Sequence, residues 1–246
     1  MNSYVEVRGS EFLQWLFRFN ILRYRASGTF TREAHAEGSM ETNNPTLVYV
    51  IDDDSEVRAS LEAVLSSQGY QVQKFVSGAE FLANCDLQSA CCVLADVHMP
   101  GLDGLELQEE ITKRKIPAGT VMITGSADVA LAVRVIKAGA IDILQKPFSN
   151  NQLLALVPVA LENAQEKLRA LKEQRRAERL LSLLTPREYD VAQLVISGHG
   201  SKAIAEKMHL SPRTVEFHRA KLMNKLQIST VPALIKILSV ADRTIP

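Results

Sequence analysis

Two hydrophobic periodicities alternate along residues 46–149. Short β-branched apolar runs predict buried strands, and after most of them apolar residues recur every three or four positions, as on one face of a helix. Ser77 and Asp128 can serve as N-caps of such helices, and Gly69 and Gly139 can end them. The predicted strands are 47–51, 70–76, 91–96, 120–124 and 142–146. Strands that alternate with helices predict an α/β fold with a doubly wound, five-stranded parallel sheet.

A purely helical pattern follows Ser149. Pro158 should bend or restart the first helix, because proline removes a backbone donor. Beyond it, apolar residues at steps of three and four suggest either a short coiled-coil-like seam or a solvated linker helix. Four short helical segments come next, at 186–197, 201–208, 212–226 and 231–240. The predicted domains are therefore an extension (1–45), an α/β domain (46–160), a helical linker (161–182) and an all-α domain (183–246).

The extension does not resemble the rest of the chain. It holds the only Trp, in the run FLQWLFRFNILRY, which is too short to span a bilayer. A polar ETNNPT stretch then separates it from the first strand, and Met40 would make a sensible start. We expect residues 1–45 to be disordered or foreign to the native protein.

Charge is divided between the two halves, although the whole chain of 246 residues is neutral. Residues 47–160 carry eight Lys/Arg and fourteen Asp/Glu, whereas residues 161–246 have a net charge of +6. This division favours a metal-binding or regulated module joined to one that binds a polyanion. Three cysteines without zinc spacing predict buried thiols in a reducing cytoplasm, with no membrane association.

Polar residues stand just past the ends of four predicted strands. Asp52 and Asp53 follow the first strand, Asp96 ends the third, Thr124 ends the fourth and Lys146 ends the fifth. The carboxyl ends of parallel strands meet at one edge of a sheet, where ligands bind. We therefore expect three acids, a hydroxyl and an amine to converge there.

Three neighbouring carboxylates repel one another, and a divalent cation relieves that repulsion. Mg²⁺ is the natural candidate, because it pairs with a few carboxylates and with phosphate oxygens. A phosphoryl group accepted by Asp96 would supply that phosphate, and Lys146 would offset its charge. The Thr124 hydroxyl could then bond a phosphoryl oxygen and pull its loop inward.

In this order and spacing, the region resembles the receiver domain of bacterial two-component response regulators, which has a flavodoxin-like fold. The matching segments are VIDDD, LADVHMPGLDG, VMITG and LQKPF. The resemblance implies phosphorylation of Asp96, switch roles for Thr124 and Lys146, and a cis Lys146–Pro147 bond. It implies Mg²⁺ ligation by Asp53, Asp96 and the His98 backbone carbonyl, with Asp52 acting through water. Ile143 departs from the pattern, because many receivers have an aromatic switch residue there.

The segment SKAIAEKMHLSPRTVEFHRAKLMNKL reads as two helices and a tight turn. Ser211 can cap the second helix, with Pro212 at its first position. Val215, Leu222 and Leu226 should face the core, which leaves a basic opposite face suited to the major groove of DNA.

This half resembles the LuxR-type DNA-binding domain, and its pairing with a receiver points to the FixJ subgroup. The resemblance implies backbone contacts from Lys202, Thr214, His218 and Lys221, and base contacts from Glu216, Phe217 and Ala220. The predicted DNA-contacting residues are Lys202, Arg213, Thr214, Glu216, Phe217, His218, Arg219, Ala220 and Lys221.

The sequence thus predicts a cytoplasmic transcriptional regulator, an activator by resemblance, switched by a sensor histidine kinase and not an enzyme beyond its own phosphorylation and dephosphorylation. Phosphorylation would favour a homodimer through the 128–148 face on a DNA operator with two-fold symmetry, and RNA polymerase is a candidate partner. Two alternatives stay open. One is a haloacid dehalogenase-like phosphatase with Asp52 as nucleophile and Asp54 as acid. The other is a constitutive DNA-binding protein whose receiver is not phosphorylated.

Overall fold

A computed structural model describes residues 47–241, apart from 87 and 127. The prediction for residues 1–45 lies outside the described residues. The chain divides into two compact units that meet between Gln165 and Glu166. Within the described residues, no helix combines the length and the apolar character needed to cross a lipid bilayer.

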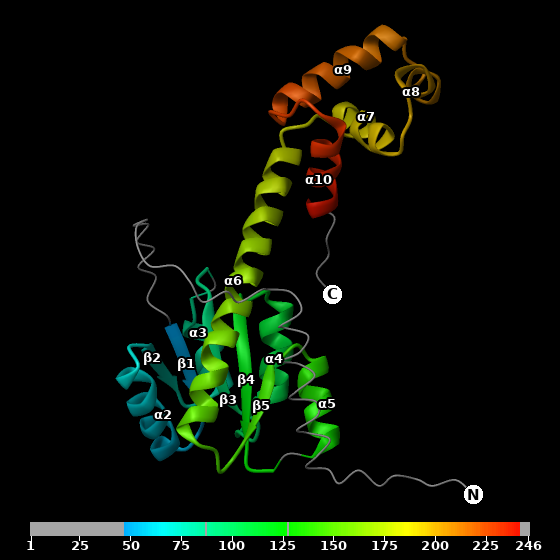
Figure 1. Ribbon diagram of the computed structural model, residues 1–246. Helices are drawn as coiled ribbons and strands as arrows, with labels where there is room; N and C mark the ends of the chain where they lie inside the picture. The colour runs from blue at the N-terminus through cyan, green and yellow to red at the C-terminus, as the bar shows by residue number, and fades with distance from the viewer. Residues whose placement is uncertain (1–46, 87, 127, 242–246) are drawn as a thin grey trace, which may run out of the picture. The chain divides into compact units, whose positions relative to one another are not determined.

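The first unit contains a five-stranded sheet in the order β2-β1-β3-β4-β5, and all of its neighbouring strands are parallel (Figure 1). The predicted fold class is confirmed. The strands are β1 (Leu47–Ile51), β2 (Gln71–Phe75), β3 (Cys91–Asp96), β4 (Ala118–Thr124) and β5 (Asp142–Gln145).

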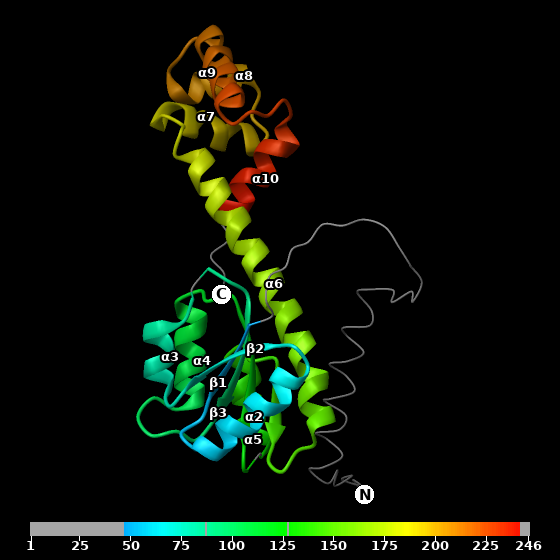
Figure 2. The ribbon, with the colours of Figure 1, turned by 90° about the vertical axis from the view of Figure 1, so that its left-hand side faces the viewer.

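Helices cover both faces of the sheet (Figure 2). On one face, α2 (Ser55–Ser67) and the first turns of α6 (Asn150–Leu181) pack on β1, β3 and β4 through a cluster that includes Leu65, Leu94 and Leu153. On the other face lie α3 (Gly78–Asn84), α4 (Gly104–Lys113) and α5 (Val129–Lys137). Because β3 and β4 are buried on both faces, their sequences are continuous apolar runs and do not alternate.

The sequence predicts a bend or a restart at Pro158, and helix α6 continues through this residue without a restart. The Pro158 ring lies on the exposed side of the helix, so water can reach the carbonyl whose hydrogen bond proline removes. Two residues further on, at Ala160, the backbone of α6 passes directly over β4. A Cβ built on Gly119 would come within 1.9 Å of the Ala160 carbonyl oxygen, so only glycine fits at this crossing.

The second unit is helical, as predicted. After α6 it contains α7 (Pro186–Ile196), α8 (Ser201–Met208), α9 (Pro212–Lys225) and α10 (Val231–Ala241). Its core includes Val191, Ile204, Val215 and Leu222, all at most 1% exposed. His209 adopts the left-handed conformation that turns the chain from α8 into α9.

An ion pair between a buried glutamate and a partly exposed lysine connects the start of α7 with the end of α9. Thr185 and Glu188 form a capping box at the start of α7, and the Glu188 side chain is only 4% exposed. Lys225, at the end of α9, places its Nζ 2.6 Å from Glu188 Oε2 and 3.1 Å from the Leu183 carbonyl oxygen. Burial alone would raise the pKa of Glu188, but the Lys225 ammonium and the bonds from Thr185 together lower it to about 2.

Replacing Gly119 by alanine should destabilise the first unit by roughly 2–4 kcal/mol, because the methyl group would collide with the α6 backbone. Thermal unfolding followed by calorimetry measures this loss. Gly125→Ala is the control, since a Cβ there meets nothing within 4 Å. Equal stability of the two variants would contradict the close approach.

Lys225→Met should lower the free energy of unfolding at neutral pH by about 1–3 kcal/mol, because Glu188 loses its counter-ion in a nearly buried place. Since the folded pKa of Glu188 is depressed, the stabilisation is present above its ordinary value of 4.5 and is lost as pH falls towards about 2. The wild type and the variant should therefore converge in unfolding temperature over that range. Lys236→Met, at an exposed site on α10, should cost little at any pH. A difference between wild type and Lys225→Met that did not change with pH would count against the pairing.

Candidate functional site

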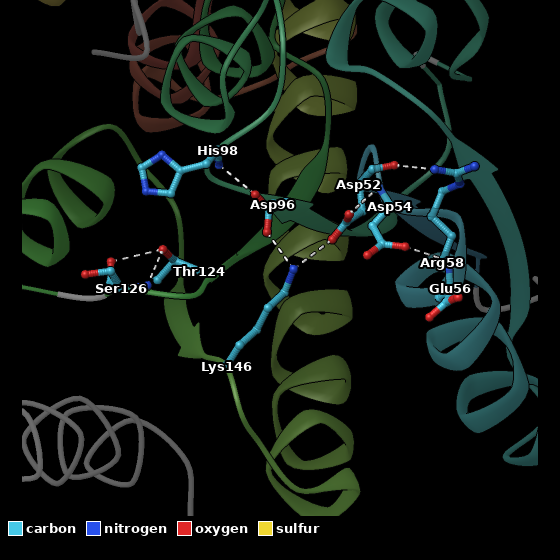
Figure 3. Close-up of polar contacts among 9 residues, drawn as sticks. All are labelled: Asp52, Asp54, Glu56, Arg58, Asp96, His98, Thr124, Ser126 and Lys146. Carbon is cyan, nitrogen blue, oxygen red and sulfur yellow. Dashed lines mark hydrogen bonds and ion pairs between the residues drawn. The ribbon is translucent and has the colours of Figure 1, made fainter.

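Four strands of the first unit deliver polar side chains to one edge of the sheet (Figure 3). Asp52 follows β1, Asp96 ends β3, Thr124 ends β4 and Lys146 follows β5. The predicted convergence at the carboxyl ends of the strands is thus present for these residues. The Lys146–Pro147 bond, which carries the lysine into the site, is cis.

The Lys146 ammonium lies between two carboxylates. Its Nζ is 3.0 Å from Asp52 Oδ2 and 2.7 Å from Asp96 Oδ1. The side chains of Asp52 and Asp96 are only 3% and 9% exposed, so both charges have left bulk water. Buried carboxylates of this kind need a cation or several hydrogen bonds.

Electrostatics favour a charged lysine and leave the site acidic. Burial by itself would lower the pKa of Lys146, but its hydrogen bonds and attraction to Asp96 and Asp52 outweigh this and raise the pKa above its ordinary value. One ammonium facing two carboxylates leaves an excess of negative charge. The pocket is therefore suited to a further cation.

Backbone groups fix the remaining carboxylate oxygens. The His98 N–H donates to Asp96 Oδ2 at 2.7 Å, and the Asp54 N–H donates to Asp52 Oδ1 at 2.8 Å. The Arg58 guanidinium, from α2, donates to the Asp52 carbonyl oxygen at 2.7 Å. These bonds hold the two acids in place without using all of their lone pairs.

Asp53 is exposed at the start of the loop after β1, whereas Asp52 is buried. Among the described residues, no three or more His, Cys, Asp or Glu side chains gather closely enough to hold a metal by themselves. Asp52 and Asp96 are thus the pair that the fold brings together. A cation here would need further oxygens besides these two acids, from backbone carbonyls, from water or from Asp53 at the exposed rim.

The Thr124 side chain is buried and turned towards its own loop (Figure 3). Its hydroxyl donates to the Ser126 carbonyl oxygen at 3.0 Å, and the Ser126 N–H lies 3.2 Å from the same hydroxyl. Ser126 stands shortly before α5, so the position of Thr124 is coupled to the entry into that helix.

In the second unit, α9 presents a polar face opposite its core residues. Arg213, Glu216, Phe217, Ala220 and Lys221 are exposed at steps of one, three and four. The Phe217 ring is 56% exposed, and Lys221 Nζ lies 4.6 Å from its centroid. A helix that packs one side in its unit and exposes the other, with basic residues, is the form that helix-turn-helix domains place in a major groove.

The other predicted DNA contacts differ in their surroundings. Lys202 is exposed on α8, while Thr214 is half-buried and its hydroxyl is 2.8 Å from Ser211 Oγ. His218 is half-buried, and its Nδ1 has no hydrogen-bond partner among the described residues. Arg219 is half-buried as well, with one guanidinium nitrogen 2.9 Å from Ser201 Oγ.

Three residues that hydrogen-bond to the site residues were not predicted from the sequence. Arg58 bonds a backbone oxygen six residues away, and that contact leaves no motif in the sequence. Ser126 acts through its backbone, which any residue could provide. Ser201 could have been noticed as the first residue of α8, but its contacts with α9 depend on how the two helices cross.

Comparisons with known families match both units. Residues 48–158 match the response regulator receiver domain, and residues 182–238 match the bacterial regulatory proteins of the luxR family. The transcriptional regulatory protein FixJ of Bradyrhizobium diazoefficiens is 37% identical over 77% of this chain and 93% of its own length. The tetrathionate response regulatory protein TtrR of Salmonella typhimurium is 38% identical over 77% of this chain and 90% of its own length.

Among solved structures, the response regulator StyR is similar, with a TM-score of 0.65 and 36% identity over 79% of this chain and 98% of that one. The family matches, the relatives and the parallel sheet all agree. This chain belongs to the response regulators that join a receiver domain to a LuxR-type DNA-binding domain, and it is a transcriptional regulator of the FixJ kind.

Proposed function

We propose that Asp96 is the phosphoacceptor and that its phosphorylation controls DNA binding by the second unit. The observation that carries this proposal is the Lys146 ammonium held between buried Asp52 and Asp96. An Asp96 oxygen attacks the phosphorus of the donor, a new P–O bond forms, and the bond to the donor's leaving group breaks. Lys146 stays protonated throughout and stabilises the charge that develops on the phosphoryl oxygens.

The residues of the pocket fit Mg²⁺, which receiver domains generally use at the phosphorylation site. Two nearly buried carboxylates with spare lone pairs match a cation that takes one or two acids and keeps several waters. Asp52, Asp53, Asp96 and the His98 carbonyl would hold it, with Asp53 entering from the exposed rim. When bound, Mg²⁺ supplies Lewis-acid stabilisation of phosphoryl oxygens.

Thr124 and Lys146 would convert the modification into a change of shape. A phosphoryl group on Asp96 offers new acceptor oxygens, so the Thr124 hydroxyl can leave the Ser126 carbonyl and donate to one of them. The segment before α5 would follow. Because Ile143 replaces the usual aromatic residue and is half-buried against the core, this route does not need an aromatic side chain to swing.

Helix α5 offers a surface for a second copy of the chain. Val129, Val133 and Ile136 are 39%, 40% and 42% exposed, and their spacing of four and three places them on one face of the helix. Exposed apolar residues that gather in this way mark an interaction surface. We infer a homodimer through the 128–148 face, formed after phosphorylation, that places two DNA-binding units on an operator with two-fold symmetry.

The α9 face would enter the major groove. Glu216, Phe217 and Ala220 would meet base edges, with Glu216 accepting from cytosine. Lys202, Arg213, Thr214, His218, Arg219 and Lys221 would contact phosphates or support those that do. The receiver and DNA-binding domains together imply a sensor kinase and DNA as partners, and we propose activation of transcription, with RNA polymerase as a further partner.

Two other functions are less well supported. A phosphatase with Asp52 as nucleophile would need Asp54 as a free acid, but the Asp54 carboxylate caps α2 by accepting from the Glu56 N–H at 2.8 Å. A constitutive DNA-binding protein would have no use for the acidic pocket. The experiment below separates all three, because only a switched regulator needs Asp96 for its response to a donor.

Asp96→Asn should abolish both the phosphoryl mass increase and the rise in DNA affinity that acetyl phosphate with Mg²⁺ causes in the full chain. The amide cannot accept the phosphoryl group, although it can still accept from the His98 N–H. Intact mass and gel shift on a selected DNA duplex measure the two effects, and omission of Mg²⁺ should also suppress both.

Asp86→Asn is the matched control, because Asp86 is an exposed acid that precedes β3, outside the 128–148 face, and its carboxylate accepts from the Gln88 N–H. It should respond to the donor like the wild type. An Asp96→Asn protein that still gained DNA affinity with the donor would refute the proposed switch.

Val133→Glu should prevent the dimer that follows phosphorylation, because the substitution places a charge of the same sign twice in an apolar interface. Sedimentation or light scattering of the phosphorylated chain measures the effect. Val76→Glu is the control, since Val76 is 52% exposed in the same unit but lies after β2. A Val133→Glu protein that dimerised as well as the wild type would exclude the α5 face.

A further inference from the structure

Ser201 connects α8 to the DNA-reading face of α9. Its hydroxyl contacts the carboxylate of Glu216 through Oε1, and the Arg219 guanidinium reaches the same hydroxyl at 2.9 Å. Glu216 is exposed and Arg219 is half-buried, so the contact lies at the border between the core and the reading face.

The direction of these bonds follows from the chemistry of the three groups. A guanidinium only donates and an ionised carboxylate only accepts, whereas a hydroxyl does both. Ser201 therefore accepts from Arg219 and gives its single proton to Glu216. Both bonds involve a charged group, which makes them stronger than bonds between neutral groups.

The Ser201 hydroxyl is not committed to its own helix. The N-cap of α8 is Gly200, which has no side chain, and no side-chain hydrogen bond caps this helix start. The neighbouring hydroxyl of Ser201 is directed across to α9. By contrast, α7 and α9 begin with ordinary side-chain N-caps, Thr185 and Ser211.

We propose that Ser201 is a positioning residue that determines base specificity, by holding the Glu216 carboxylate in the conformation that reads a base and by keeping Arg219 apart from it. This rests on the proposed function, in which Glu216 meets a base edge. A side chain fixed before binding loses less conformational entropy when it binds, so its preference for one base is expressed more fully.

Removal of the hydroxyl leaves two opposite charges three residues apart on one helix. At that spacing Glu216 and Arg219 can pair directly. The pair would neutralise the carboxylate that accepts from a cytosine amino group, and it would draw Arg219 away from its present position. The Ser201 hydroxyl thus bonds both charged groups and keeps them from pairing with each other.

The test selects binding sites from a random duplex DNA pool with the full-length chain, treated with acetyl phosphate and Mg²⁺. Ser201→Ala should lower the preference at one base position per half-site by about fivefold to tenfold, which lies within the range of a single specific base contact. Non-specific affinity and the dependence of binding on salt should stay close to those of the wild type, because the exposed cations Lys202, Arg213 and Lys221 are unchanged.

Three further variants make the result decisive. Ser201→Thr keeps the hydroxyl and should restore the preference. Ser197→Ala, whose hydroxyl bonds only the Gln193 carbonyl in its own helix, should leave the profile unchanged. Glu216→Gln should lose preference at the same position, and adding Ser201→Ala to it should cause no further loss.

Each alternative outcome has a separate meaning. An unchanged Ser201→Ala profile, or an equal loss of affinity for all sequences together with a lower unfolding temperature, would reduce Ser201 to a structural role and overturn the inference. A wild-type chain that enriched no sequence would instead overturn the proposed function, and this inference with it.

Discussion

The arrangement of the receiver unit depends on one ammonium group held between two buried carboxylates. Lys146 neutralises part of a charge that Asp52 and Asp96 could not carry alone away from water. Its raised pKa keeps it positive, and the two carboxylates still leave the site acidic overall, which favours a further cation. The Lys146 ammonium thus stabilises the folded unit, and in the proposed function it also stabilises the phosphoryl oxygens.

A similar arrangement recurs in the DNA-binding unit. Lys225 compensates the buried Glu188 carboxylate and fixes α9 against the start of α7. Ser201 then holds Glu216 and Arg219 at the edge of the reading face. Polar contacts with α7 and α8 thus help to set the orientation of α9 and of two of its side chains.

A short series of contacts leads from Asp96, the proposed phosphorylation site, towards α5. Asp96 is the end of β3, Thr124 is the end of β4, and the loop that Thr124 holds through Ser126 leads into α5. In the proposed function, a movement of this loop would reach α5, whose exposed apolar side chains form the proposed dimer surface. Ile143 is packed against the core, so this proposed route does not use an aromatic side chain.

The amino-acid pattern was sufficient to predict the succession of strands and helices along the chain, several helix caps and the residues that lie at the sheet edge. Buried parallel strands, helix periodicity and cap residues are local patterns, and a parallel sheet must bring its strand ends together. Which charges pair depends on how distant segments pack together in three dimensions. In the folded chain, Asp52 is buried whereas Asp53 is exposed, and α6 continues through Pro158. Arg58 donates to the Asp52 carbonyl oxygen, and Arg219 donates to the Ser201 hydroxyl. These outcomes depend on distances between segments far apart in the chain, and such distances leave no periodic trace in the order of the residues.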